Sequence, residues 1–400
     1  ILEGTESVKV NETIALLDNG SSDKIDNFLD TSINKTREKS LEEQSNHSKK
    51  IVEKQTLKST DNNEDQYKSI KSYKDLKNIS VREAINNAIA EEMRLDKNIY
   101  LMGEEVANYN GAYKVSLGML DEFGPERVVD TPIAETGFSG IGIGSAMNGL
   151  RPIIEFMTFN FSLIAMDQII NGAAKIYQMS GGQFNIPIVF RGPTGNAGQL
   201  GAQHSQNFEN WYANTPGLKV VIPSNPYEAK GLLKTSIRDD DPVIFMESEL
   251  MYGDKGKVPE SEYLIPIGKA KIVHKGNDVT LLSFGKMMKI AESAHQEAKK
   301  ENISVEVIDL RTVRPIDYKS VINSVKKTNR LVIIEEAWPL ASISSEISHH
   351  IQRFAFDYLD APVHRITCQD VPFHYAPTLL KEIVPDLNKT MKAIKEVTYS

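Results

Sequence analysis

Glu135 is the ionisable side chain whose neighbours most favour chemistry. It lies in the segment TPIAETG (131–137), among apolar and small residues and directly ahead of a run of glycines. A carboxyl group in apolar surroundings holds its proton more tightly and can share it with a nitrogen atom of a ligand. An acid at this place can also simply cap a helix, which contributes about 1 kcal/mol or less. The residues alone leave both interpretations open.

The glycine run after Glu135 is not a dinucleotide-binding fingerprint. That motif needs G-x-G-x-x-G or a final alanine. Gly140 and Gly142 are followed by Ser145 at the third position, and Gly142 and Gly144 by Met147. We expect instead a helix that packs closely against a sheet through its glycines.

A glycine-rich loop at 192–206 carries the second candidate, His204. The loop follows a predicted strand and lacks the Gly-Lys-Ser/Thr end of a phosphate-binding loop. His204 is on the carboxyl side of that strand, where open α/β sheets bind ligands, but a lone histidine in a polar loop is more often exposed to solvent. The spacing of His349, His350 and Cys368 does not fit a zinc site.

The elements that must position these residues alternate between strand and helix. In the first part, strands are predicted at 98–102, 153–156, 186–190, 219–222 and 242–245, with helices at 81–94, after Glu135, at 162–179 and at 226–237. In the second part, strands are predicted at 279–284, 304–309 and 331–335, with helices at 286–300, 316–327 and 342–356. This alternation predicts a mostly parallel sheet with helices on both faces in a domain at 77–265, followed by a second α/β domain at 266–400.

Composition sets the limits on the class of protein. The chain has 400 residues, of which 40% are hydrophobic and 25% charged, so it is neither wholly disordered nor fibrous. A net charge of -8 disfavours nucleic acid as a partner. The single cysteine, Cys368, excludes a disulfide framework and fits a reducing compartment. No apolar run reaches the roughly 18 residues of a membrane span, so no membrane is expected.

The segments that carry chemistry belong to a larger pattern. It includes GEEVANYNGAYKVS (103–116), RVVDTPIAETGFSGIGIGSAMNGLRPIIEFMTFNFS (127–162), AQHSQ (202–206) and VIDLRTVRPID (307–317). Over about 77–400 the chain resembles the beta subunit of the thiamine-diphosphate-dependent pyruvate dehydrogenase component. The resemblance implies an α/β chain with an aminopyrimidine-binding thiamine-diphosphate fold, followed by a transketolase C-terminal-like domain. It also implies oxidative decarboxylation of pyruvate, with reductive acetylation of lipoyl groups.

The resemblance gives roles to particular residues. Glu135 resembles the glutamate that hydrogen-bonds the ring nitrogen of the cofactor's aminopyrimidine and shares a proton with it. Ile133, Met157 and Phe161 are then expected to line the aminopyrimidine pocket. His204 resembles the active-site histidine near the substrate and the incoming lipoyl group.

The resemblance also implies partners and ions. The Gly-Asp-Gly…Asn segment that holds magnesium and the diphosphate is missing, so an alpha subunit is expected to supply it in an α2β2 heterotetramer, without which the chain is inactive. Asp360 resembles an acid that meets the peripheral-subunit-binding domain of the dihydrolipoyl acetyltransferase core. A structural potassium ion is expected, mainly through carbonyl groups, at Ile188, Ser236, Ile237, Asp239 and Asp241.

The N-terminal residues suggest a different module. Residues 1–20 resemble the C-terminal end of a lipoyl domain, and residues 21–76 lack Gly and Pro and are densely charged, so we expect a disordered linker. This arrangement resembles that of alphaproteobacteria and favours the bacterial cytoplasm, with the mitochondrial matrix as the alternative. Branched-chain 2-oxoacid and acetoin dehydrogenase beta subunits remain alternatives, although EFMTFNFS (155–162) looks like the pyruvate type. A non-catalytic scaffold or carrier is a further alternative, against which Glu135 and His204 argue.

Overall fold

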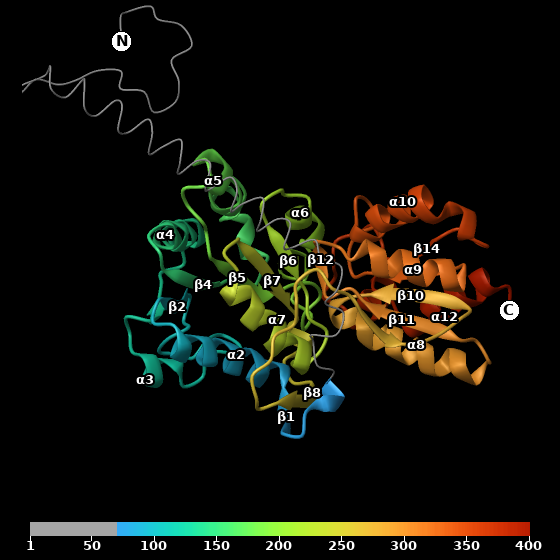
Figure 1. The fold of residues 1–400 in the computed structure, drawn as a ribbon, viewed down its shortest axis with the longest axis horizontal. Helices are drawn as coiled ribbons and strands as arrows, with labels where there is room; N and C mark the ends of the chain where they lie inside the picture. Colours follow the sequence, from blue (N-terminus) through green and yellow to red (C-terminus); the bar gives the residue numbers. More distant parts are fainter. Residues whose placement is uncertain (1–69) are drawn as a thin grey trace, which may run out of the picture. The chain divides into compact units, whose positions relative to one another are not determined.

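The computed structural model describes residues 70–400, which lie within one compact unit, Tyr67–Ser400 (Figure 1). The predicted lipoyl-domain remnant and the predicted linker up to residue 69 lie outside the described residues. The linker was expected to reach residue 76. Ile70–Ser72 nevertheless forms a short 3-10 turn, and Leu76 begins a strand.

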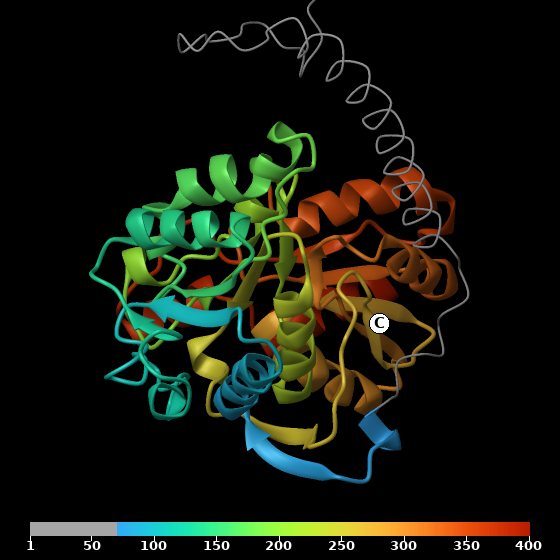
Figure 2. The same cartoon turned by 60° about the vertical axis from the view of Figure 1, so that its left-hand side comes forward.

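The first half of this unit alternates strands with helices. Its strands are β1 (Leu76–Ser80), β2 (Ile99–Gly103), β3 (Val128–Asp130), β4 (Arg151–Glu155), β5 (Val189–Pro193), β6 (Lys219–Val221), β7 (Val243–Glu247) and β8 (Lys255–Pro259). Its helices are α2 (Val81–Leu95), α3 (Met119–Phe123), α4 (Glu135–Met147), α5 (Ala174–Met179), α6 (Glu209–Ala213) and α7 (Pro226–Arg238). Strands β1 and β8 form a separate antiparallel pair beside α2 and α7 (Figure 2).

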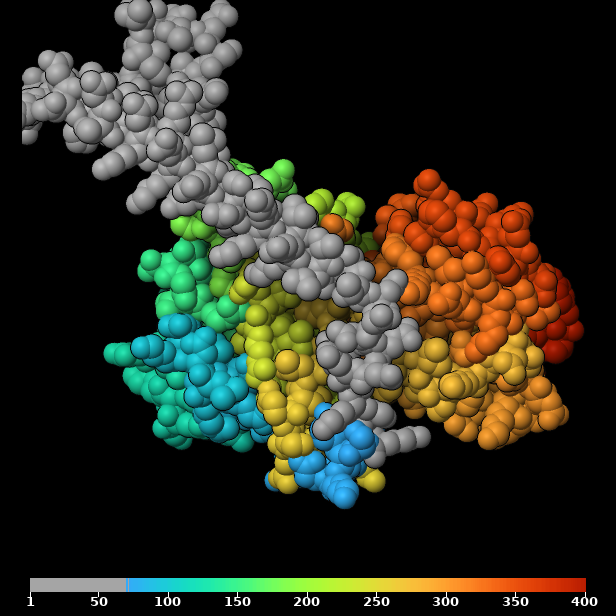
Figure 3. All heavy atoms as spheres, in the orientation of Figure 1, coloured from blue at the N-terminus to red at the C-terminus, as the bar shows by residue number. Residues whose placement is uncertain are grey.

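The second half repeats this alternation on a smaller scale. Its strands are β9 (Lys271–His274), β10 (Val279–Ser283), β11 (Val305–Asp309), β12 (Thr312–Arg314), β13 (Leu331–Ile334) and β14 (His364–Ile366). Its helices are α8 (Met288–Lys300), α9 (Tyr318–Thr328), α10 (Ile343–Ala355), α11 (Pro377–Ile383) and α12 (Leu387–Thr398). Five strands form a sheet in the order β14-β13-β10-β11-β9, in which only β9 is antiparallel to its neighbour. This half is the orange-to-red part of the space-filling view (Figure 3).

A seven-stranded sheet forms the centre of the first half, in the order β12-β6-β7-β5-β4-β2-β3. Every neighbouring pair in it is parallel except β12 with β6. Helices α2 and α7 cover one face, and α4, α5 and α6 cover the other. The predicted α/β fold with a parallel sheet between two helical layers is therefore confirmed.

Helices α2 and α7 begin where the sequence predicts them. The Ser80 hydroxyl accepts a hydrogen bond from the Glu83 backbone at 3.2 Å, and the Glu83 carboxylate accepts one from the Ser80 backbone at 2.7 Å. This reciprocal capping box satisfies two amides that would otherwise lack partners. At α7 the Asn225 side chain accepts from the Glu228 backbone, and Pro226 occupies the first turn.

Two predicted elements differ from the structure. The helix expected at 162–179 is broken into a 3-10 turn (Phe161–Leu163), a π-helix (Gln168–Ala173) and the short α5. Packing against α4 rather than local periodicity shapes this segment, since a Cβ at Gly172 would lie 3.3 Å from Ile143. The strand expected at 186–190 begins only at residue 189, because Pro187 has no amide to donate to a ladder.

The two halves share one apolar core. A single cluster of buried side chains runs from α4 and β4 through β10 to α9 and α10. Strand β12 from the second half also completes the first sheet by pairing with β6. Among residues 70–400, no helix has the length and apolar character needed to cross a membrane.

Candidate active site

The candidate site lies at the carboxyl edge of the seven-stranded sheet. Three segments leave the sheet there: residues 131–135 after β3, residues 156–164 after β4 and residues 194–207 after β5. Thr136, in the first turn of α4, donates its hydroxyl to the carbonyl of Ile164 at 2.6 Å. This bond holds the start of α4 beside the segment that follows β4. Open parallel sheets bind their ligands at this edge.

Two buried carboxyl groups meet at the start of α4. Glu135 is the first residue of the helix and is only 3% exposed. Glu104 reaches it because the Thr131 amide donates to the Gly103 carbonyl at 3.0 Å, which aligns the two segments. Burial and then the neighbouring carboxyl of Glu135 raise the pKa of Glu104 to about 7. With its pKa raised this far, Glu104 keeps its proton up to near neutral pH and can act as a proton donor beside Glu135.

The other predicted site residues lie on the same side of the sheet. Ile133 is 82% exposed, whereas Met157 and Phe161 are half-buried. Phe161 packs edge-on against His204, with ring centroids 5.2 Å apart. His204 is half-buried in a 3-10 turn, so it is not the fully exposed histidine that the local sequence favours. The roles predicted for these residues remain predictions.

A buried ionic network fixes the strand ends from which these segments leave. Arg191 on β5 is 1% exposed and forms ion pairs with Glu155 at the end of β4 and Glu247 at the end of β7. The Tyr252 hydroxyl donates to Glu247 at 2.6 Å. The Phe156 amide donates to the Arg191 carbonyl at 2.9 Å, so the segment after β4 starts in register with β5.

Family models and a solved structure of the transketolase type resemble this chain. Family models described as the transketolase pyrimidine binding domain and the transketolase C-terminal domain match residues 77–255 and 268–389. A solved structure described as split gene transketolase, inactive beta4 tetramer, has a TM-score of 0.65 at 18% identity, covering 80% of this chain and 98% of its own. At that identity the likeness concerns the fold.

The curated relatives are much more similar. The pyruvate dehydrogenase E1 component subunit beta of Rhizobium meliloti is 54% identical over 322 residues, which are 80% of this chain and 70% of that protein. The protein of the same name in Rickettsia felis is 51% identical over 80% of this chain and 98% of its own. This chain belongs to the pyruvate dehydrogenase E1 beta subunit family. A mitochondrial E1 beta-1 subunit of Oryza sativa is 52% identical over 81% of this chain and 87% of its own.

The potassium ligands expected for an E1 beta chain lie together around the end of α7. They are Ile188, Ser236, Ile237, Asp239 and Asp241. The ammonium group of Lys219 pairs with Asp239 at 2.7 Å and with Asp241 at 2.9 Å. Arg151 donates to the carbonyls of Ile237 at 3.0 Å and Asp239 at 2.6 Å. These two cations contact the oxygens of Ile237, Asp239 and Asp241, and the potassium ion stays a prediction from the resemblance.

Asp360 lies on the surface of the second half, just before β14. Its carboxylate is about half exposed and pairs with Arg330 at 3.3 Å. The Tyr399 hydroxyl donates to the Asp360 carbonyl at 3.0 Å, which places the residue next to the end of α12. An exposed acid in a fixed turn suits a docking surface, and its contact with the acetyltransferase core remains a prediction.

Glu104 is the site residue of this E1 beta chain that local sequence does not single out. One of its carboxylate oxygens, Oε1, is buried and has no hydrogen-bond partner among the described residues. Its signal in the sequence is positional, because it follows a buried strand that pairs with the strand leading to Glu135. Recognising Glu104 as a site residue therefore requires knowing that β2 and β3 are neighbours in the sheet.

Proposed function

We propose that this chain forms the aminopyrimidine half of a thiamine-diphosphate site and, with an alpha subunit, oxidatively decarboxylates pyruvate and reductively acetylates lipoyl groups. The observation that carries the proposal is the buried Glu104–Glu135 pair at the carboxyl edge of the sheet. The names of the relatives support pyruvate as the substrate. Relatives in Rhizobium and Rickettsia support the bacterial cytoplasm as the compartment, and the Oryza relative keeps the mitochondrial matrix as the alternative.

The residues fit an aminopyrimidine ring. The unpartnered oxygen of Glu104 and the carboxyl of Glu135 provide a proton donor and acceptor side by side. Met157 and Phe161 add apolar surface, and Ile133 presents an exposed side chain that a bound ring would cover. Thiamine diphosphate supplies the nucleophilic carbon when it is bound. Glu135 would hold a proton at the ring nitrogen, and Glu104 would be its buried carboxyl neighbour.

The alpha subunit completes the site. We assign magnesium and the diphosphate to it, because those groups need ligands that this chain's sequence does not offer. Exposed apolar side chains surround the site, with Ile133 at 82%, Ile141 at 63% and Ile164 at 60% exposure. Large apolar side chains that stay exposed in this way are typical of a partner interface. An α2β2 heterotetramer that docks on the acetyltransferase core near Asp360 accounts for these surfaces.

The test is Glu135→Gln in the co-expressed alpha–beta enzyme. Glutamine keeps the shape of the side chain but cannot share a proton, so we expect pyruvate turnover to fall by about 10²-fold or more while assembly is kept. The matched control is Glu126→Gln, an exposed glutamate ahead of β3, which should leave turnover unchanged. Wild-type turnover in Glu135→Gln would refute the assignment. A clear preference for 2-oxoisovalerate over pyruvate would point to the branched-chain class instead.

A further inference from the structure

The two ends of the loop that carries His204, residues 194–196 and 206–207, lie side by side. We call these two ends the neck of the loop. The Gly195 amide donates to the Gln206 carbonyl at 3.0 Å, and the Thr194 amide donates to the Glu247 carbonyl at 2.9 Å. The Gln206 amide in turn donates to the side chain of Asn160 at 3.0 Å. The neck therefore sets where His204 lies relative to the segment after β4.

Two charged side chains of the second half, Lys286 and Glu336, contact this neck. Lys286 follows β10, and Glu336 follows β13. The Lys286 ammonium group donates to the carbonyl of Asn196 at 2.5 Å and pairs with Glu336 at 2.6 Å. Glu336 also contacts the Asn196 backbone and the Asn207 side chain, whose amide group donates to its carboxylate at 3.3 Å. Lys286 thus contacts one side of the neck, and Glu336 contacts both sides.

The approach is close enough to require glycine. Gly195 has φ +78°, and a Cβ there would lie 2.5 Å from the Glu336 carboxylate and 2.8 Å from the Asn207 side chain. The Lys286 and Glu336 side chains are 10% and 7% exposed, so their attraction is little screened by water. Breaking one partner of such a buried pair costs far more than breaking a surface pair.

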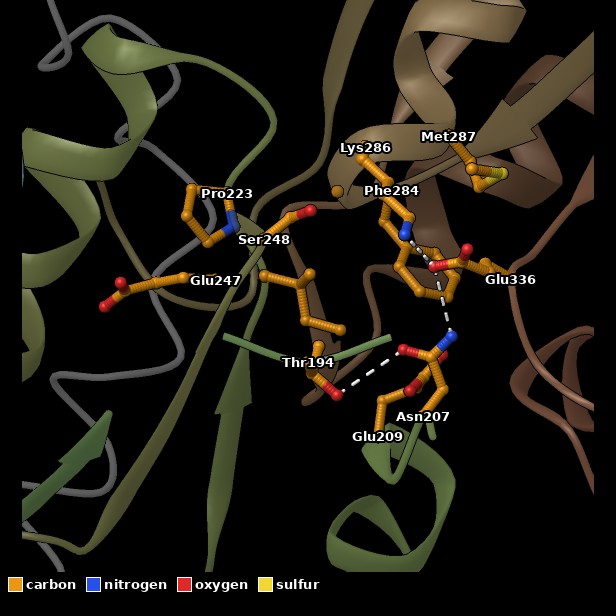
Figure 4. Close-up of a pocket in the computed structure, with 12 residues that line it drawn as sticks. Thr194, Asn207, Glu209, Pro223, Glu247, Ser248, Phe284, Lys286, Met287 and Glu336 are labelled. Atoms are coloured by element: carbon orange, nitrogen blue, oxygen red, sulfur yellow. Dashed lines mark hydrogen bonds and ion pairs between the residues drawn. The ribbon is translucent and has the colours of Figure 1, made fainter. Parts of the chain in front are cut away.

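A small cavity lined by both polar and apolar side chains adjoins the pair (Figure 4). Its volume is about 30 Å³, so it is too small for a substrate or a cofactor ring. It is lined on one side by Thr194, Asn207 and Ser248 of the first half, and on the other by Lys286 and Glu336. The contact between the halves at this point therefore includes charged and polar groups beside the apolar side chains Ile222, Phe284 and Met287.

We propose that Lys286 and Glu336 are positioning residues that set the conformation of the His204 loop from the second half of the chain. The pair acts through Asn196 and Asn207 and does not itself touch the site. The catalytic part of this inference rests on the proposed function, because it takes His204 as an active-site residue.

The experiment uses the co-expressed alpha–beta enzyme with Lys286→Met and, separately, the isosteric Glu336→Gln. Amide hydrogen exchange across residues 195–206 should speed up by about 10-fold or more, as expected for the loss of a charge-assisted hydrogen bond. We expect kcat to fall because the loop has lost its contact with the pair, while KM for pyruvate changes little. Lys286→Arg keeps the charge and should restore protection of the loop. The matched control is Lys289→Met, which removes an exposed ion pair with Asp254 at the start of α8.

Two outcomes separate the inference from the proposed function. Unchanged exchange across 195–206 in assembled Lys286→Met or Glu336→Gln enzyme would overturn the positioning role, whatever His204 does. Faster exchange in these variants, together with wild-type kcat both in them and in His204→Ala, would support the contact between the pair and the loop. It would overturn the role of the pair in catalysis through His204.

Discussion

Gly142 and Gly144 in α4 offer a matched pair of substitutions. A Cβ at Gly142 would lie 2.7 Å and 3.0 Å from two carbons of Ile154 and 3.2 Å from Ile188, whereas a Cβ at Gly144 would meet nothing within 4 Å. Both isoleucines are fully buried. Only one of the two glycines is thus needed for the close packing of helix on sheet that the sequence predicts.

The expected energies follow from this geometry. Forcing a methyl group into a filled core costs about 1–3 kcal/mol. Replacing a helical glycine with alanine stabilises a helix by up to about 1 kcal/mol, and this gain is common to both variants. Gly144→Ala should therefore stabilise the chain slightly, and Gly142→Ala should lie about 1–3 kcal/mol below it in free energy of unfolding.

Urea unfolding of the two purified variants measures this difference directly. Because α4 begins at Glu135, Gly142→Ala should also lower pyruvate turnover in the alpha–beta enzyme, and Gly144→Ala should not. Equal unfolding free energies for the two variants would show that α4 does not pack on the sheet in the way described.

Three further predictions concern stability. Arg191→Met leaves Glu155 and Glu247 buried without their cation and should cost about 3–5 kcal/mol in urea unfolding; Arg191→Lys, which keeps the charge, should cost less, and equal losses would contradict the ionic explanation. The pKa of Glu104 rises from 4.5 to about 7 on folding. Its stabilising contribution to the free energy of unfolding is therefore fully present below pH 4.5 and is lost as the pH rises through 7. Glu104→Gln should flatten this pH dependence of the unfolding midpoint, and an unchanged profile would place the titration elsewhere. Ser80→Ala removes the cap of α2 and should cost about 1 kcal/mol, which thermal unfolding would detect; no loss would mean that the cap is dispensable.

Local signals predicted the elements whose formation is local. The capping box at Ser80 and Glu83 predicts the start of α2 correctly, because the bonds involved lie within one helical turn. The segment 162–179 has helical composition, but contacts with α4 and α6 decide its path, as in the bond between the Ser162 and Tyr212 hydroxyls at 2.6 Å. Strand β12 has only three residues and exists because β6 offers an edge to it.

The candidate site divides in the same way. Glu135 could be singled out from its apolar neighbours, whereas the role predicted for His204 came from the resemblance of its segment to the family. Glu104 could not, since its significance depends on β2 lying beside β3 in the sheet. The contacts of Lys286 and Glu336 with the His204 loop join residues that are far apart in the sequence. Asn207 and Glu336 are 129 positions apart, and no local sequence pattern predicts a contact over such a separation.

The pairing of β12 with β6 also bears on how the chain is made. Until residues 312–314 have been synthesised, β6 lies at an open edge of an otherwise nearly complete parallel sheet. Exposed edges of this kind recruit other strands, so the nascent chain passes through an aggregation-prone stage that ends only late in translation. A gene cut between the two halves would make that stage permanent for the first product unless the second were present to supply the missing strand.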